Sequence, residues 1–109
     1  PTDFNKVVYG DHNYPRKFKS IKSITLEVNE IGLNYLKQLA SNFDLSFNKN
    51  YIQCNDFRIY YKLKKKIDKT LLKTIEINLT ESLPSKTSLI SSNITVSILN
   101  NTAQLVFKH

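Results

Sequence analysis

The feature that most constrains this chain is an alternation of apolar and polar residues that returns in four separate segments. The segments are residues 24–28, 57–63, 75–79 and 94–98. A period of two places all the apolar side chains of a segment on one face of a β-strand. The sequence therefore predicts a sheet with one apolar face, on which helices are expected to pack.

One segment has the longer period of a helix. Its apolar residues recur at spacings of three and four, which places them along one side of a helix over residues 30–43. They are Leu33, Leu36, Leu39, Ala40 and Phe43. Asn29 is a suitable N-cap residue, and Glu30 suits the positive end of the helix. Gly32 is expected to weaken the first turn by about 1 kcal/mol relative to alanine.

The remaining segments give weaker signals. Residues 45–53 are a plausible strand interrupted by asparagines, and residues 55–56 form a turn. Pro84 is acceptable in the first turn of a helix, which predicts a short helix over residues 84–91. Residues 100–101, both asparagine, predict a tight turn, after which residues 103–107 fold back as a hairpin partner. Residues 1–20 show no sustained period and are expected to form an irregular basic arm, with one short strand at residues 6–9.

This order of elements favours an α+β fold. We expect a ferredoxin-like two-layer sandwich, with a mainly antiparallel sheet, one long helix and one short helix, together with the N-terminal arm and the C-terminal hairpin. At 109 residues, the chain provides one domain, which we place at residues 21–109 after the arm at residues 1–20.

The formal charge of +7 points to a polyanionic partner such as nucleic acid, or to an anionic membrane face. Within residues 57–63, the apolar face is predicted to be core and the opposite face to be cationic, with the ring of Tyr60 in it. The cationic cluster continues into the following loop, where Asp68 is the single acid. Its basic members are Arg58, Lys62, Lys64, Lys65, Lys66, Lys69 and Lys73.

Two interpretations of this cluster remain open, and both can hold together. In the first, the lysines neutralise phosphates and release counterions, so that the patch binds nucleic acid without regard to base sequence. Tyr60 is able to stack on an unpaired base. Arg16, Lys17 and Lys19 would anchor the arm in the same way. Alternatively, the lysines protect a solvated edge strand from aggregation.

Features of enzymes are sparse. His12 and His109 lie at opposite ends of the chain, and Cys54 is the only cysteine, so no intrachain disulfide forms and a reducing compartment is favoured. The sequence has no phosphate-binding glycine loop, zinc-ligand spacing or nucleophile elbow. No apolar run approaches the roughly 18 residues of a membrane span. We expect no catalysis, no cofactor or metal, no small-molecule substrate and no membrane partner.

With the element order in view, the stretch "DKTLLKTIEINLTESLPSKTSLISSNITVSI" resembles the ribosomal protein S-ten family, including its mitochondrial variants. That family opens with a strand and a long helix, here "ITLEV" and "EIGLNYLKQLASNF". It continues with a segment of the type Arg-Thr-His-Lys-Arg-Leu-Ile-Asp-Ile, here "KTLLKTIEI", then a Pro-Lys-Thr helix and a last strand, here "LPSKTSLI" and "NITVSI". Within the first of these, the matching positions are Lys69, Thr70, Lys73, Ile75, Glu76 and Ile77.

The resemblance covers residues 24–98 and has clear departures. The family's Pro-Leu-Pro-Thr segment is replaced by "NYIQCND", its histidine falls on Leu71, and the strand at residues 103–107 is added. The resemblance implies a structural role without catalysis, in which the chain packs on ribosomal RNA and neighbouring ribosomal proteins. The expected location is a ribosome of the mitochondrial matrix, or alternatively of the cytoplasm.

A different class of function stays open beside this one. The chain is alternatively a non-catalytic protein-interaction module of another assembly. In that case the edge at residues 100–107, or the arm, adds a strand or a segment to a partner.

Overall fold

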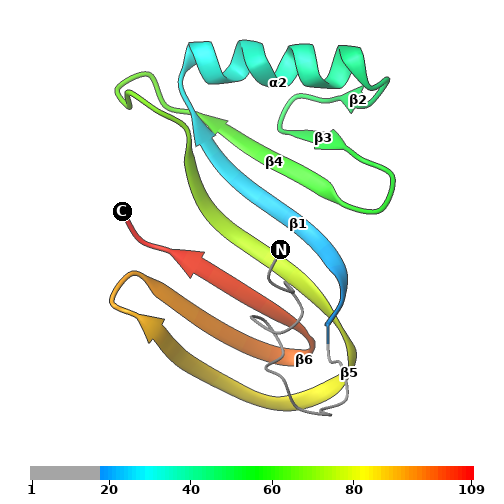
Figure 1. The fold of residues 1–109 in the computed structure, drawn as a ribbon, viewed down its shortest axis with the longest axis vertical. Coiled ribbons are helices and arrows are strands. Elements are labelled where there is room, and N and C mark those ends of the chain that lie inside the picture. Colours follow the sequence, from blue (N-terminus) through cyan, green and yellow to red (C-terminus); the bar gives the residue numbers. More distant parts are fainter. Residues whose placement is uncertain (1–17) are drawn as a thin grey trace, which may run out of the picture.

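The computed structural model describes residues 18–109, so the predicted strand at residues 6–9 and the side chains of Arg16 and Lys17 lie outside the described residues. The described part has an α+β fold with one helix and a six-stranded mixed sheet of order β2-β3-β4-β1-β5-β6 (Figure 1). The elements are β1 (Phe18–Val28), α2 (Glu30–Asn42), β2 (Ser46–Phe47), β3 (Tyr51–Gln53), β4 (Arg58–Leu63), β5 (Leu71–Ser91) and β6 (Ile94–Phe107).

The sheet has the apolar face that the alternation predicts. β1 pairs in parallel with β4 and antiparallel with β5, and the other pairs are antiparallel. Because paired residues share a face, one apolar row crosses four strands; it consists of Ile59, Ile24, Ile75 and Leu105. The neighbouring row, on the opposite face, is polar and consists of Arg58, Ser23, Glu76 and Gln104.

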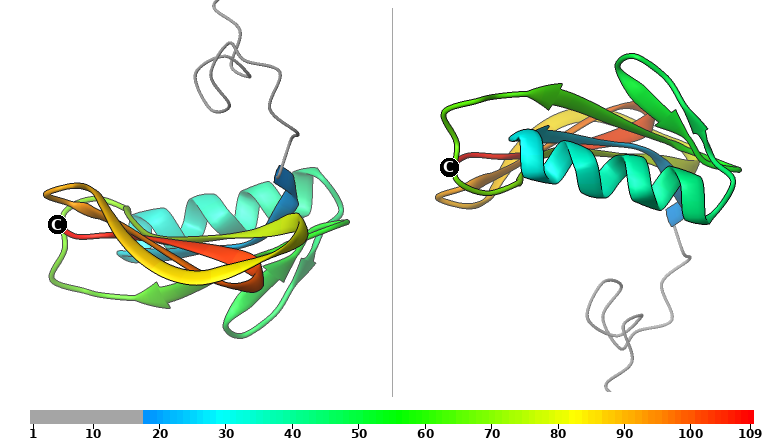
Figure 2. Two further views of the ribbon diagram at one scale, coloured as in Figure 1. Left: turned by 90° about the horizontal axis from the view of Figure 1, so that it is seen from below. Right: turned by 90° about the horizontal axis from the view of Figure 1, so that it is seen from above.

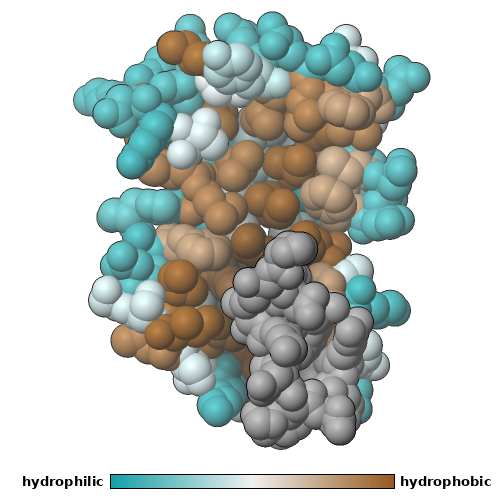
Figure 3. Space-filling view, in the orientation of Figure 1, coloured by the Kyte–Doolittle hydropathy of each residue, from teal (hydrophilic) through white to brown (hydrophobic). Residues whose placement is uncertain are grey.

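The helix lies on the apolar side of the sheet only (Figure 2). Leu36 and Ala40 of α2 are buried in a cluster with Val28 of β1 and Ile52 of β3. The helix ends at Asn42, and Phe43, predicted to be on its apolar side, is the C-cap residue and is 68% exposed. On this side of the molecule, hydrophobic residues also gather over the central strands below α2 (Figure 3). The core under the helix is therefore small, and the apolar face extends beyond it.

The short helix predicted for residues 84–91 is wrong, because these residues belong to β5. β6 pairs with them residue by residue, for example Thr87 with Ser97 and Ser88 with Val96. Pro84 lies where the register shifts between Leu83 and Lys86, so its missing N–H costs no regular ladder bond. Serine, threonine and isoleucine are poor helix formers, and pairing with β6 decides the outcome.

The predicted turn at residues 100–101 has the expected local conformation but a different place in the fold. Asn100 has a positive φ of 58°. Both arms of β6 nevertheless pair with β5, and the hairpin turn lies at residues 92–93. At the irregularity opposite Asn100 the hairpin folds back on itself, so that the backbone N–H of Lys108 donates to the carbonyl of Asn93 at 2.8 Å (Figure 1). The C-terminal hairpin is therefore the whole of β5 and β6.

The region at residues 45–53 forms two short strands in place of one. β2 and β3 pair antiparallel, and the backbone N–H of Asn48 donates to the carbonyl of Tyr51 at 2.8 Å, which closes the turn between them. The predicted turn at residues 55–56 is confirmed, since the N–H of Cys54 donates to the carbonyl of Phe57 at 2.9 Å. The short hairpin brings β3 against β4 and covers the end of the core.

The connection from β4 to β5 positions the candidate site. β1 lies between these two strands, so the chain must cross the end of β1, where α2 begins. We call residues 64–69 the lysine bend. The N–H of Lys64 donates to the carbonyl of Val28 at 2.7 Å. The side chain of Asn29 accepts from the N–H of Gly32 at 2.9 Å and donates to the carbonyl of Ile67 at 3.2 Å, so the N-cap residue also holds the bend.

This double role makes Asn29 a sensitive position. We predict that Asn29→Ala lowers the free energy of unfolding by about 1–2 kcal/mol, since it removes both the cap and the contact with the bend. Chemical denaturation followed by circular dichroism measures the loss. Asn34→Ala, on the exposed side of α2, is the matched control and should change stability by no more than about 0.5 kcal/mol. Equal losses for the two variants would contradict the assignment.

The surroundings of Gly32 leave little room for a side chain. A Cβ at this position would lie 2.7 Å from Oγ1 of Thr70 and 3.1 Å from Cβ of Val28. We therefore predict that Gly32→Ala destabilises the protein although alanine is the better helix former. In a Thr70→Ala background the same change should cost less, and a double-mutant cycle on the free energy of unfolding measures this coupling. A higher free energy of unfolding for the single variant Gly32→Ala would contradict this prediction, because it would show that a Cβ fits at this position.

Candidate nucleic-acid interface

The strand part of the predicted cluster has the expected alternation. Ile59 and Tyr61 of β4 pack against the core, whereas Arg58 and Lys62 are exposed and Tyr60 is half-buried. Cross-strand pairing of Tyr60 with Tyr51 and Thr25 places it on the face opposite to α2. The face predicted to be cationic is thus free of the helix.

Arg58 has several partners within the protein. Its Nε donates to Oε1 of Gln53 at 2.7 Å, and its guanidinium carbon lies 4.3 Å from the centre of the Tyr51 ring. The rings of Tyr51 and Tyr60 are 5.8 Å apart. A hydrogen bond with Tyr60 raises the pKa of Arg58, so the group stays cationic at any physiological pH. Tyr51 and Gln53 were not predicted as members of this group, because the register of β3 against β4 is not visible in the sequence.

The charges around this group are balanced. A hollow of about 410 Å³ lies beside Arg58 and Tyr60, and it is lined by Lys22 as well as by Asp56 and Glu76. The Glu76 carboxylate accepts a hydrogen bond from Oγ of Ser23 at 2.8 Å. Two basic and two acidic side chains meet here, which gives this face little net attraction for a polyanion.

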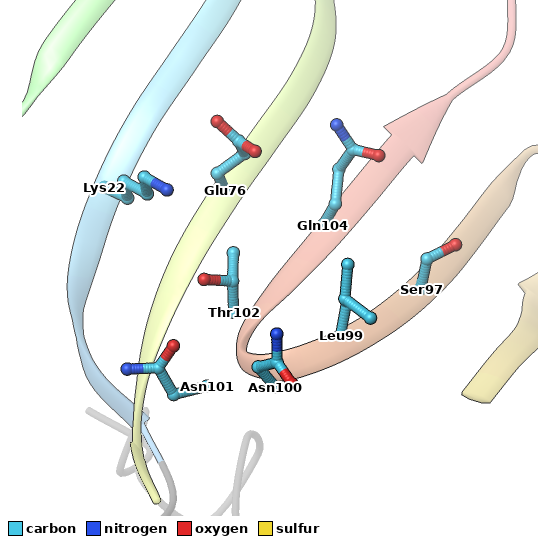
Figure 4. A pocket seen from close by; sticks show the side chains of 8 residues that line it. All are labelled: Lys22, Glu76, Ser97, Leu99, Asn100, Asn101, Thr102 and Gln104. Carbon is cyan, nitrogen blue, oxygen red and sulfur yellow. The ribbon is translucent and has the colours of Figure 1, made fainter. Parts of the chain in front are cut away.

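A second hollow on the sheet, of about 390 Å³, lies where the β5–β6 hairpin folds back (Figure 4). Lys22 and Glu76 approach it from β1 and β5, and the side-chain amides of Asn100 and Asn101 lie at its lower end. One cation, one carboxylate and neutral amides line it, with no cysteine or histidine among the lining residues.

The lysine bend is strongly cationic. Lys65, Lys66 and Lys69 are exposed and Lys64 is half-buried. The bend lies against the first turn of α2, where Lys65 and Ile67 line a hollow of about 370 Å³ together with Asn29, Glu30 and Ile31. The N-terminal end of a helix carries a partial positive charge, and the four lysines of the bend outnumber the nearby carboxylates of Glu30 and Asp68.

Other predicted members of the cluster are separated from the bend. Lys19 is exposed near the start of β1, about 30 Å from the bend along the strand, since each residue rises roughly 3.3 Å. Lys73 is half-buried in β5, where the register shifts opposite Thr25 and Leu26. The structure thus joins Lys62 and residues 64–69 but does not join Lys19 or Lys73 to them.

The structure adds two lysines that were not predicted. Lys37 of α2, Lys49 of the β2–β3 turn and Lys62 of β4 surround a hollow of about 400 Å³, which we call the lysine hollow. It is also lined by Leu33, Phe47, Asn50, Tyr61 and Leu63. The rings of Phe47 and Tyr61 are stacked, with centres 5.5 Å apart, and the Tyr61 hydroxyl donates to the carbonyl of Asn48. Lys37 and Lys49 are isolated in the sequence, so no local pattern marks them.

Candidate catalytic and metal-binding groups gain no support from their surroundings. Within residues 18–109, no group of three or more histidine, cysteine or acidic side chains is placed to hold a metal ion. The His109 ring contacts the carbonyl of Leu72 at 2.7 Å, and His12 lies outside the described residues. In the same described range, no helix has the length and apolar character needed to cross a membrane.

Comparison with known proteins returns no match, neither to a family model nor to a curated protein or a solved structure.

The reactivity of the Cys54 thiol can be measured directly. Burial raises the pKa of Cys54, so less thiolate is present at neutral pH, and the thiolate is the reactive form. We predict that the folded protein reacts several-fold more slowly with a disulfide reagent at pH 7.5 than the same chain unfolded in urea, which serves as the internal control. A folded protein that reacts faster than the unfolded chain would indicate an activated cysteine.

Proposed function

We propose that this protein is a non-catalytic, RNA-binding subunit of a ribonucleoprotein assembly and that its lysine bend holds backbone phosphates. The observation that carries the proposal is the position of the bend, which holds the exposed Lys65, Lys66 and Lys69 and places Lys65 beside the N-terminal end of α2. Cations at this end of a helix are repelled by its dipole, whereas anions are attracted to it. The arrangement therefore costs folding stability and favours phosphate binding.

The alternative, in which the lysines protect an exposed edge strand from aggregation, accounts for fewer of the lysines. Over residues 58–60, β4 is paired on both sides, with β3 and with β1. Only the end of β4, around Lys62, lacks a β3 partner in the register. Lys65, Lys66 and Lys69 lie in the connection and not in a strand, so protection against edge pairing does not account for them.

A ribosome is the assembly that the resemblance to the S-ten family implies, with ribosomal RNA and neighbouring ribosomal proteins as partners and the mitochondrial matrix as the location. The succession of β1, the long α2 and a parallel β4 supports this, together with the finer proposal of a ferredoxin-like sandwich. The segment that would match the family's Pro-Lys-Thr helix is a strand here. Support from the resemblance is therefore limited to residues 24–43 and 69–77.

A second candidate function, a protein-interaction module, is favoured by a different observation. Ile75, Ile77 and Leu105 are half-buried on the apolar side of the sheet, and in the described range no second helix covers β5 and β6. Hydrophobic residues are visible there beside the helix (Figure 3). An apolar sheet face of this kind is usually covered by another layer. In a ribonucleoprotein subunit, this layer would belong to a neighbouring protein.

RNA binding is tested by changing the bend alone. We predict that the triple variant Lys65→Gln, Lys66→Gln, Lys69→Gln binds a labelled structured RNA more weakly in fluorescence anisotropy. Between about 50 and 200 mM salt, the slope of log K against log salt should become shallower by about 0.7 for each lysine that held a single-strand phosphate.

A matched control separates specific placement from total charge. Lys22→Gln, Lys86→Gln, Lys108→Gln removes the same charge from exposed lysines outside the bend and the lysine hollow. This variant should retain most of the affinity. Equal losses for the two triple variants, or an affinity of the unchanged protein that does not respond to salt, would overturn the proposal.

A further inference from the structure

We infer that the lysine hollow holds one unpaired nucleotide of a bound RNA strand, with the base against Phe47 and the flanking phosphates at Lys37 and Lys49. The inference rests on the proposed function and names the form of RNA that the protein selects. It concerns a different site from the bend, formed by the helix, the β2–β3 turn and β4.

The charges of the lysine hollow match a polyanion better than those of any neighbouring hollow. Lys37 of α2 and Lys49 of the β2–β3 turn line it, Lys62 borders it from β4 with a side chain that belongs to the opposite face of the strand, and no acidic side chain is among its lining residues. The hollow beside Arg58, in contrast, contains Asp56 and Glu76. Its volume of about 400 Å³ falls within the roughly 300–1,000 Å³ of ligand sites in proteins.

The apolar part of the hollow argues for a base as well as phosphates. Phe47 and Leu63 are 38% and 39% exposed, although both belong to the apolar side of the sheet. A ligand that is only anionic would leave these side chains in contact with water, and one that is only apolar would leave the lysines without a counterpart. A nucleotide has both a flat apolar face and a charged phosphate, and aromatic rings are common stacking platforms for unpaired bases.

The hollow and the proposed phosphate site are adjacent along the chain at the end of β4. Lys62 borders the hollow, and the lysine bend begins two residues later at Lys64. A strand of RNA that places one nucleotide in the hollow can therefore continue along the bend. Bases in a duplex are stacked inside the helix and do not enter such a hollow, so the site favours single-stranded RNA.

The chain contains no tryptophan, which allows a direct reporter at this position. We expect the fluorescence of Phe47→Trp to be quenched by a single-stranded RNA of mixed sequence and not by a duplex of the same sequence. Leu89→Trp, an exposed position of the β5–β6 hairpin, is the matched control and should respond to neither RNA. Equal quenching of Trp by single strand and duplex in Phe47→Trp would overturn the inference.

Affinity provides the second readout. Phe47→Ala should weaken single-strand binding by about tenfold and leave duplex binding unchanged, because one stacking contact is lost. If Phe47→Ala fails to fold, Phe47→Leu keeps the apolar bulk without the ring and should show the same selective loss. Lys37→Gln, Lys49→Gln should also weaken single-strand binding.

The outcomes separate this inference from the proposed function. If RNA does not quench the fluorescence of Phe47→Trp but binding still depends on the three bend lysines, the nucleotide site is overturned and the proposed function stands. Failure of the unchanged protein to bind either RNA at low salt overturns both.

Discussion

The position of β1 between β4 and β5 is the constraint on which the rest of the structure depends. Because both neighbours of β1 are joined to each other along the chain, the connection between them has to cross the strand end where α2 begins. Hydrogen bonds from Lys64 to Val28 and from Asn29 to Ile67 fix this crossing. A cationic connection is thereby held against the positive end of a helix, which is a consequence of strand order and not of local preference.

The parts of the fold that local physics determines were predictable, and the parts that pairing determines were not. Alternation identified the strands, and the helix was visible from its period and from the cap at Asn29. Residues 84–91 have no strong preference of their own and become strand because β6 lies beside them. Asn100 adopts the positive φ that its residue type favours, but the local signal does not tell whether a turn joins two paired strands or bends one.

The candidate site also has a part that is visible in the sequence and a part that only the fold brings together. The lysines of residues 64–69 are contiguous, so the sequence shows them together. Lys37 and Lys49 join Lys62 only because α2 and the β2–β3 turn pack beside β4, which no sequence spacing indicates. Conversely, Lys19 lies about 30 Å from the bend along β1, and Lys73 is half-buried in β5. The charge along the sequence therefore indicates a polyanionic partner, but it does not indicate which lysines lie together on the surface.

Folding and binding are coupled through these same lysines. Lysines beside the N-terminal end of a helix are unfavourable for stability, which the carboxylate of Glu30 and the hydrogen bonds of Asn29 offset. A polyanion at the bend screens this unfavourable interaction, so whatever binds the native arrangement also stabilises it. A neighbouring protein layer over the uncovered apolar face would remove its side chains from water and would also stabilise the fold. Under the proposed function, both partners would therefore add to the stability of the chain.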